Sequence, residues 1–195
     1  VLLGSVGKLT AGFAALGLTI GATQLIQNGV ATAASFEDID TSLRFLTGSM
    51  EKFQESRKFI REFAATTPLE VQDVAKAFNA LTAAGLEPIK TLPKLVDAVV
   101  IAGTAAGSLT EGLNRLIRAF VQMAGRPKLT TQELNQMSEI GIPAARLLRE
   151  ELEKTGRVIR GDIGEASIES AQGIQLLLTA LERNFAGASK AFAGN

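Results

Sequence analysis

Three neighbouring carboxylates are the residues whose types and spacing most readily suggest chemistry. Glu150, Glu151 and Glu153 lie close together on a predicted helix, and paired carboxylates can act as a general acid and a general base. Basic residues at helical spacing accompany them, a pattern typical of ion pairs on an exposed helix. We therefore interpret these carboxylates as surface charges and predict no catalytic residue and no metal ligand.

A second candidate is the segment GSVGK at residues 4–8, whose glycines and lysine suggest a loop that binds phosphate. Such a loop needs an earlier glycine at a fixed spacing and a Ser or Thr directly after the lysine. The chain lacks that glycine and has Leu9 after Lys8. We therefore reject a nucleotide-binding loop and expect no cofactor.

The composition excludes several classes of function. Cysteine and histidine are both absent, which removes thiolate and imidazole metal ligands, cysteine nucleophiles and histidine bases. Lys and Arg number 20 and are balanced by 20 Asp and Glu, so the basic surface expected of a dedicated nucleic-acid binder is missing. Trp and Tyr, which commonly stack on bases or sugars, are absent as well. We predict a protein that is not an enzyme and binds no specific nucleic acid.

The elements that must position these residues are helices. Apolar residues recur at three and four positions along much of the chain, and no alternating strand pattern of useful length occurs. We predict an all-α fold, a compact multi-helix domain of short capped helices preceded by a long apolar Gly/Ala-rich helical arm. The arm occupies residues 1–35 and the helical core residues 36–155. Residues 156–195 supply a turn, a last helix and an Ala/Gly-rich tail that we expect to lead into a longer chain.

The arm has two interpretations, because residues 9–36 carry no charge. An uncharged run of this length can span a bilayer, and small residues allow close helix contact there. Thr, Gln and Asn dilute its second half, which equally suits a helix buried against copies of itself or against another protein. We take Gly12, Gly17 and Gly21 as its candidate assembly positions.

Several helix ends are predicted from local residues. Thr67, Pro68 and Glu70 have the spacing of an N-cap, a first helical residue and a capping-box partner, and Gly85 is expected to end that helix. A uniformly apolar helix over residues 95–102 follows and is expected to be central in the core.

Two further features concern the helix over residues 95–102 and the one after it. Pro88 and Pro93 are expected to bracket the approach to the first of these helices. Ser108 and Glu111 predict a capping box at the start of the next helix.

The stretch over residues 122–145 organises the rest of the chain. It begins with Gln122 at a helix end and continues through a turn to Thr130 and Glu133, which have the spacing of a capping box. The short helix that follows should end at Gly141 in a left-handed conformation, and Pro143 prevents its continuation.

Four segments, in this order, resemble the N-terminal tape measure domain of the tail tape measure proteins of tailed bacteriophages. They are FLTGS at residues 45–49, FAATTPLE at 63–70, LTAAG at 81–85 and the organising stretch up to Pro143. The resemblance covers about residues 36–155. This chain departs from the usual family pattern in its GRPKL turn and in having NQM where Gln-Leu is usual.

The resemblance implies a structural component of a phage tail. Such proteins are long and mostly helical, lie in the lumen of the tail or at its tip, set the length of the tail tube and leave ahead of the DNA at infection. Because a helix advances about 1.5 Å per residue, chain length translates into tube length. The implied locations are the host cytoplasm during assembly, the virion, and the host envelope at infection.

The implied partners are copies of the same chain as a trimer or hexamer, tail-tube and tail-tip or baseplate proteins, tail assembly chaperones, and the host membrane during ejection. The alternative function is that of a membrane-inserting or pore-forming helical protein, for which the uncharged arm is the evidence. A cell-wall hydrolase, which accompanies some tape measure proteins, has no identifiable catalytic Glu here.

Overall fold

The structure is a computed structural model that describes residue 37, residues 39–103 and residues 107–193. The predicted apolar arm, including Gly12, Gly17 and Gly21, lies outside the described residues. The chain divides into two compact units, residues 1–54 and residues 55–195. In the described part of the first unit, residues 39–47 are helical and Gly48 has a φ of +66°. The helix over residues 39–47 therefore ends at this glycine.

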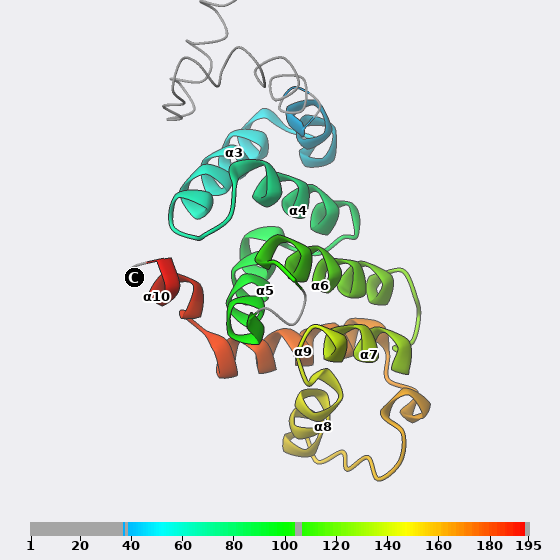
Figure 1. Cartoon of the computed structure of the whole chain (residues 1–195). Coiled ribbons are helices and arrows are strands. Elements are labelled where there is room, and N and C mark those ends of the chain that lie inside the picture. Colours follow the sequence, from blue (N-terminus) through cyan, green and yellow to red (C-terminus); the bar gives the residue numbers. More distant parts are fainter. Residues whose placement is uncertain (1–36, 38, 104–106, 194–195) are drawn as a thin grey trace, which may run out of the picture. The chain divides into compact units, whose positions relative to one another are not determined.

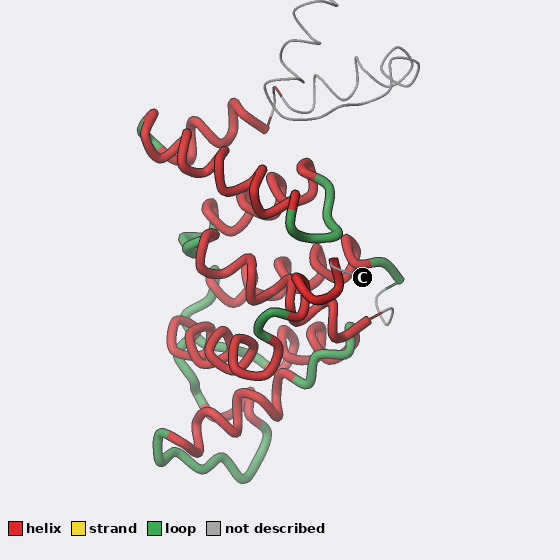
Figure 2. The backbone as a smooth tube through the Cα atoms, turned by 90° about the vertical axis from the view of Figure 1, so that its left-hand side faces the viewer, coloured by secondary structure: helices red, strands yellow, loops and turns green. Residues whose placement is uncertain are grey.

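The helix α3 (Met50–Ala65) begins in the first unit and continues into the second. The other helices follow in chain order, and Figures 1 and 2 show them with their connecting loops. They are α4 (Val71–Ala83), α5 (Pro88–Ala102), α6 (Leu109–Ala124), α7 (Thr131–Glu139), α8 (Ala144–Lys154), the 3₁₀ helix η2 (Ile163–Ala166), α9 (Ser170–Phe185) and α10 (Ala188–Ala193). The described residues contain no strand beyond one isolated bridge between Lys128 and Glu169, which confirms the all-α class.

The helix α5 is the centre of the second unit. It packs against α4, α6, α9 and α10 (Figure 1). Leu92, Leu95 and Val96 on it are completely buried. The prediction of a central apolar helix is confirmed, although the helix is longer than predicted. It begins at Pro88 and includes Pro93 rather than starting after it. Burial of the apolar side chains around Pro93 offsets the helical hydrogen bond that a proline cannot donate.

The helix α9 covers α5, α6 and α8, and so it joins the last part of the chain to the earlier helices. Its buried face includes Ile174, Leu177 and Leu181. The connection over residues 125–130 and the start of α9 are held side by side by the Lys128–Glu169 bridge. The C-terminal segment is thus part of the same core as the organising stretch.

Gly85 ends the helix α4 as predicted. Gly85 has a φ of +74°, and the N–H groups of Gly85 and Leu86 donate to the carbonyls of Thr82 and Leu81, both at 3.0 Å. These bonds form a Schellman motif, which satisfies the last carbonyls of α4. Ser108 caps α6, because its Oγ accepts the N–H of Glu111 at 3.1 Å, which is one half of the predicted capping box. The Glu111 carboxylate pairs with Arg115.

The predicted start of α4 is wrong. The helix begins at Val71 with Glu70 as its N-cap, so Thr67 and Pro68 lie in the connection before it. Thr67 Oγ1 donates to the carbonyl of Phe63 at 2.9 Å, and the hydroxyl therefore serves the end of α3 instead of α4. Leu69 in this connection is buried, and its packing holds the chain out of the helix.

Candidate functional site

The predicted capping box at the start of α7 is present. The Glu133 carboxylate accepts the backbone N–H of Thr130 at 3.1 Å through Oε2, and the Thr130 side chain accepts the backbone N–H of Glu133. The Thr130 hydroxyl also donates to the same carboxylate oxygen. Leu129 and Leu134, on either side of the box, are buried as the staple arrangement requires. The start of α7 is thus fixed by residues of the chain's own local sequence.

A single arginine completes this cap. Glu133 is fully buried, and its second oxygen, Oε1, lies 2.9 Å from Nη1 of Arg126, which is 42% exposed. The same arginine nitrogen donates to Thr130 Oγ1 at 3.2 Å. A buried carboxylate is costly unless it is paired and hydrogen-bonded, and the cap and Arg126 together supply both requirements. The sequence pattern predicted Glu133 in the capping box of α7 but did not predict Arg126 as its partner.

The other end of α7 also forms as predicted. Gly141 has a φ of +87°, and its N–H donates to the carbonyl of Ser138 at 2.9 Å. The N–H of Ile142 donates to the carbonyl of Met137 at 3.0 Å, which completes a Schellman motif. Pro143 then stands as the N-cap residue of α8. The short helix α7 therefore has both of its ends set by the residues that were predicted to set them.

The turn before α7 is attached to the start of α9 by two backbone hydrogen bonds. Leu129 N–H donates to the carbonyl of Ile168 at 2.9 Å, and Ser170 N–H donates to the carbonyl of Pro127 at 3.0 Å. A Cβ on Gly173 would lie 2.6 Å from Leu129 Cδ1. The turn and α9 can approach this closely because Gly173 has no side chain. These contacts between backbone groups were not predicted from the sequence.

A second attachment joins α7 to η2. Asp162 Oδ1 accepts the N–H of Gly164 at 2.8 Å and the hydroxyl of Thr131 at 2.9 Å. The hydrogen bond from the Gly164 N–H, followed by that from Thr131 and the charge of Arg149, holds the pKa of the Asp162 carboxyl below its ordinary value of 3.8. A Cβ on Gly164 would lie 2.0 Å from Thr131 Oγ1 and 2.6 Å from its backbone nitrogen. Only glycine fits at this contact.

Gln122 lies in the last turn of α6. Its side-chain oxygen is buried and accepts no hydrogen bond from the described part of the chain. Its predicted role in assembly stays a prediction. The other predicted site residues, Thr67, Pro68, Gly85, Gly141 and Pro143, lie at or next to the ends of four helices, α3, α4, α7 and α8, so the structure does not gather them in one pocket.

The three carboxylates of α8 differ from the prediction in one respect. Glu150 pairs with Arg146 at 2.7 Å on the surface, and Glu153 is exposed, as predicted. Glu151 is buried, with 6% of its surface exposed, and pairs with Lys154 at 3.2 Å and with Arg183 of α9. Burial by itself would raise the pKa of Glu151, but the hydrogen bonds and positive charges of Lys154 and Arg183 lower it below the ordinary 4.5. This carboxylate joins two helices and is not a surface charge.

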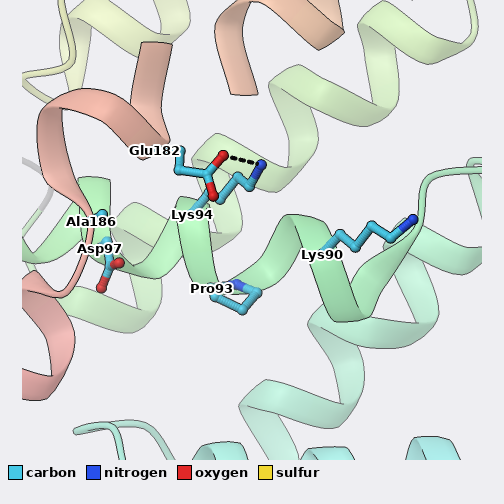
Figure 3. A pocket seen from close by; sticks show the side chains of 6 residues that line it. All are labelled: Lys90, Pro93, Lys94, Asp97, Glu182 and Ala186. Atoms are coloured by element: carbon cyan, nitrogen blue, oxygen red, sulfur yellow. Dashed lines mark hydrogen bonds and ion pairs between the residues drawn. The ribbon is translucent and has the colours of Figure 1, made fainter. Parts of the chain in front are cut away.

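The described residues contain no group of three or more acidic, histidine or cysteine side chains placed to hold a metal ion. A pocket of about 400 Å³ lies between α5 and the end of α9, where Lys94 and Glu182 form an ion pair at 2.7 Å (Figure 3). A smaller pocket of about 280 Å³ is lined by residues of α6 and α7, Arg115, Arg118, Gln136 and Glu139. Neither pocket contains the acid, base and nucleophile arrangement of a hydrolase.

Comparison with known families decides what kind of protein this is. The sequence model of a family described as tape measure protein matches residues 27–195. The chain belongs to the tape measure protein family. The family match extends beyond the resemblance seen in the sequence, because it includes α9 and α10 as well as the organising stretch.

One curated relative supports this assignment. The chain is 25% identical over 189 residues to the Mu-like prophage FluMu protein gp42 of Haemophilus influenzae. The matched region includes 94% of this chain but only 28% of the relative, so the chain spans little more than a quarter of that protein's length. No solved structure gives a significant match.

The tape measure family is one of structural phage proteins, which agrees with a site made of capped helix ends and ion pairs. Among the described residues, no helix combines the length and apolarity needed to cross a membrane.

Proposed function

We propose that this chain is a folded node of a tape measure protein, located in the lumen of a phage tail or at its tip. The observation that carries the proposal is the family match over residues 27–195. The organising stretch contains the short helix α7, which is capped at both ends. It supports a compact domain that stays folded while a longer helical part of the protein serves as the ruler. A helix advances about 1.5 Å per residue, so such a ruler sets tube length in proportion to its number of residues.

The proposed partners are further copies of the chain in a trimer or hexamer, tail-tube and tail-tip or baseplate proteins, and tail assembly chaperones. The apolar arm and the exposed helix faces would make these contacts. At infection the protein would leave the tail ahead of the DNA and meet the host membrane. We infer that the protein acts without catalysis, and what supports this is the absence of His and Cys together with carboxylates engaged in ion pairs.

The experiment that tests the proposal changes the length of the full protein outside this domain. Deleting a number of residues from its long helical part should shorten the assembled tails by about 1.5 Å for each residue removed. Electron microscopy of purified tails measures this length directly. Tails of unchanged length would argue against the ruler.

Cell-wall hydrolysis by the purified chain, lost on changing one Glu, would argue against the non-catalytic role.

A further inference from the structure

A buried carboxylate in the apolar helix α5 receives hydrogen bonds from the other end of the chain. Asp97, with 8% of its surface exposed, lies on α5 among buried apolar residues. Its Oδ2 accepts the N–H of Gly187 at 2.8 Å, and its Oδ1 accepts the N–H of Ser189 at 2.8 Å and the Ser189 hydroxyl. These donors are the first orphan groups of α10, so a side chain distant in sequence caps this helix.

At the corner between α9 and α10, close packing does not fix Gly187. Gly187 has a φ of +83°, and a Cβ built there would meet no atom within 4 Å. Glycine can adopt this positive φ without strain, and no neighbouring atom packs against residue 187 to hold the turn in place. The helix α10 has six residues, which is far below the length at which a helix is stable by itself in water. Its position consequently depends on its contact with α5 and on Asp97.

The end of α9 is attached to α5 independently of α10. Lys94 and Glu182 form an ion pair at 2.7 Å, and Figure 3 shows this pair beside Asp97 and Ala186 in the pocket of about 400 Å³. Residues on α9 before the corner are buried, including Ala180 and Leu181. The detachment of α10 would therefore leave α9 in place, and the change in chain direction would be confined to residues 186 and 187.

We propose that Asp97 is a latch that holds α10 folded back on α5, and that the corner at residues 186 and 187 is the hinge that opens when the latch is released. With the latch closed, the chain turns back at Phe185 toward α5. With the latch open, it leaves the domain in another direction while the core stays folded. This inference depends on the contacts of α10 and does not require the proposed function.

Hydrogen exchange of the full chain measures the latch directly. The Asp97→Asn substitution keeps the size of the side chain but removes the charge that accepts three hydrogen bonds. Since a hydrogen bond to a charged group is worth more than a neutral one, we expect exchange of the amides of residues 189–193 to rise by about tenfold or more. Exchange in α6 should not change. Trypsin should also cleave faster after Lys190. Asp73→Asn is the matched control, because Asp73 joins two other helices by accepting the Thr110 hydroxyl at 3.0 Å.

A second variant leaves α5 untouched. Ser189→Ala removes one of the three donors, so α10 should exchange faster than in the unchanged chain but slower than in Asp97→Asn. The melting temperature shows whether each variant is folded. If Asp97→Asn folds and the amides of α10 exchange no faster than in the unchanged chain, the latch is overturned. If Asp97→Asn does not fold, the same result in Ser189→Ala overturns it. Loss of protection throughout the domain in Asp97→Asn would overturn the separate hinge, because Asp97 would then support the whole core.

Discussion

At the scale of single residues, the contact between Arg126 and Glu133 connects the turn to the helix that follows it. Glu133 has no exposed surface, and it serves both as the capping partner of Thr130 and as the anion of an ion pair. Such a group is stable inside a protein only while its partners remain, because the removal of one leaves a buried charge without compensation. The ion pair of Arg115 with Glu111, in contrast, is exposed on both sides.

The Arg126→Ala substitution should therefore lower the free energy of unfolding by about 2 kcal/mol, since it leaves a buried carboxylate without its positive partner. Arg115→Ala is the matched control. It breaks an exposed pair of similar length, 2.8 Å, and should cost no more than about 0.5 kcal/mol. Chemical denaturation of both variants measures the difference. Equal losses in the two would show that burial of Glu133 adds nothing to the pair.

Gly141 gives a second prediction at this scale. Its φ of +87° is a conformation that a residue with a branched Cβ adopts only with strain. Gly141→Val should lower the free energy of unfolding by about one to several kcal/mol and impair tail assembly. Gly161→Val is the control, because Gly161 has no positive φ and open space around it. Gly141→Val with an unchanged melting temperature would contradict the proposed role of this C-cap.

At the scale of elements, the sequence was informative where a helix end depends on its own neighbours. The capping box of α7 and the Schellman motifs at Gly85 and Gly141 each involve residues no more than five positions apart, so their spacing predicts them. The start of α4 was predicted wrongly for the opposite reason. The Thr67 hydroxyl had two possible partners, and packing of the buried Leu69 decided between them.

The long-range contacts were not predictable in this way. Glu151 and Asp97 are ordinary charged residues in the sequence, and their burial depends on Arg183 and on residues 187–189, which lie far along the chain. The hydrogen bonds between the turn before α7 and the start of α9 use backbone groups, which carry no residue signature. In the sequence, Gly164 and Gly173 are the residues that could have indicated these long-range contacts, because a glycine in or beside a helix can mark a close approach of two segments.

The ion pair between α8 and α9 predicts how stability depends on pH. The pKa of Glu151 is lower in the folded state than its ordinary value of 4.5, so its stabilising effect is complete above that value and is lost as the pH falls through the folded pKa. Glu151→Gln should therefore lower stability at neutral pH and reduce its fall below pH 4.5. Unfolding curves across this range measure both effects. Glu150→Gln is the control, since its pair with Arg146 is exposed, and a result equal to that of Glu151→Gln would contradict the assignment.

At the scale of the whole molecule, the chain belongs to the tape measure family, and its second unit is an all-α domain with an apolar core among the described residues of 55–193. The arm lies outside the described residues, and its role stays a prediction. We propose that it is an assembly element that packs against protein. Each glycine weakens an isolated helix by about 1 kcal/mol relative to alanine, so many glycines are better explained by close packing of backbones.

Replacing Gly12, Gly17 and Gly21 together by Leu should abolish self-association or tail assembly even though the arm becomes more hydrophobic. The measurement compares the oligomeric state and the membrane partitioning of the two forms. Polar Thr, Gln and Asn side chains in the arm would cost several kcal/mol each if they faced lipid unpaired. Assembly retained by the Leu variant, or insertion of the native arm into a bilayer without a partner, would favour the pore-forming alternative.

The most direct measurement of the central claim is an image of assembled tails in which this domain carries a label. An epitope at residues 158–161 lies in the loop between α8 and η2 and avoids the buried contacts of the organising stretch. Electron microscopy should then show the label in purified tails, at one fixed position in the lumen or at the tip. Tails that assemble to normal length without the labelled domain inside them would contradict the account.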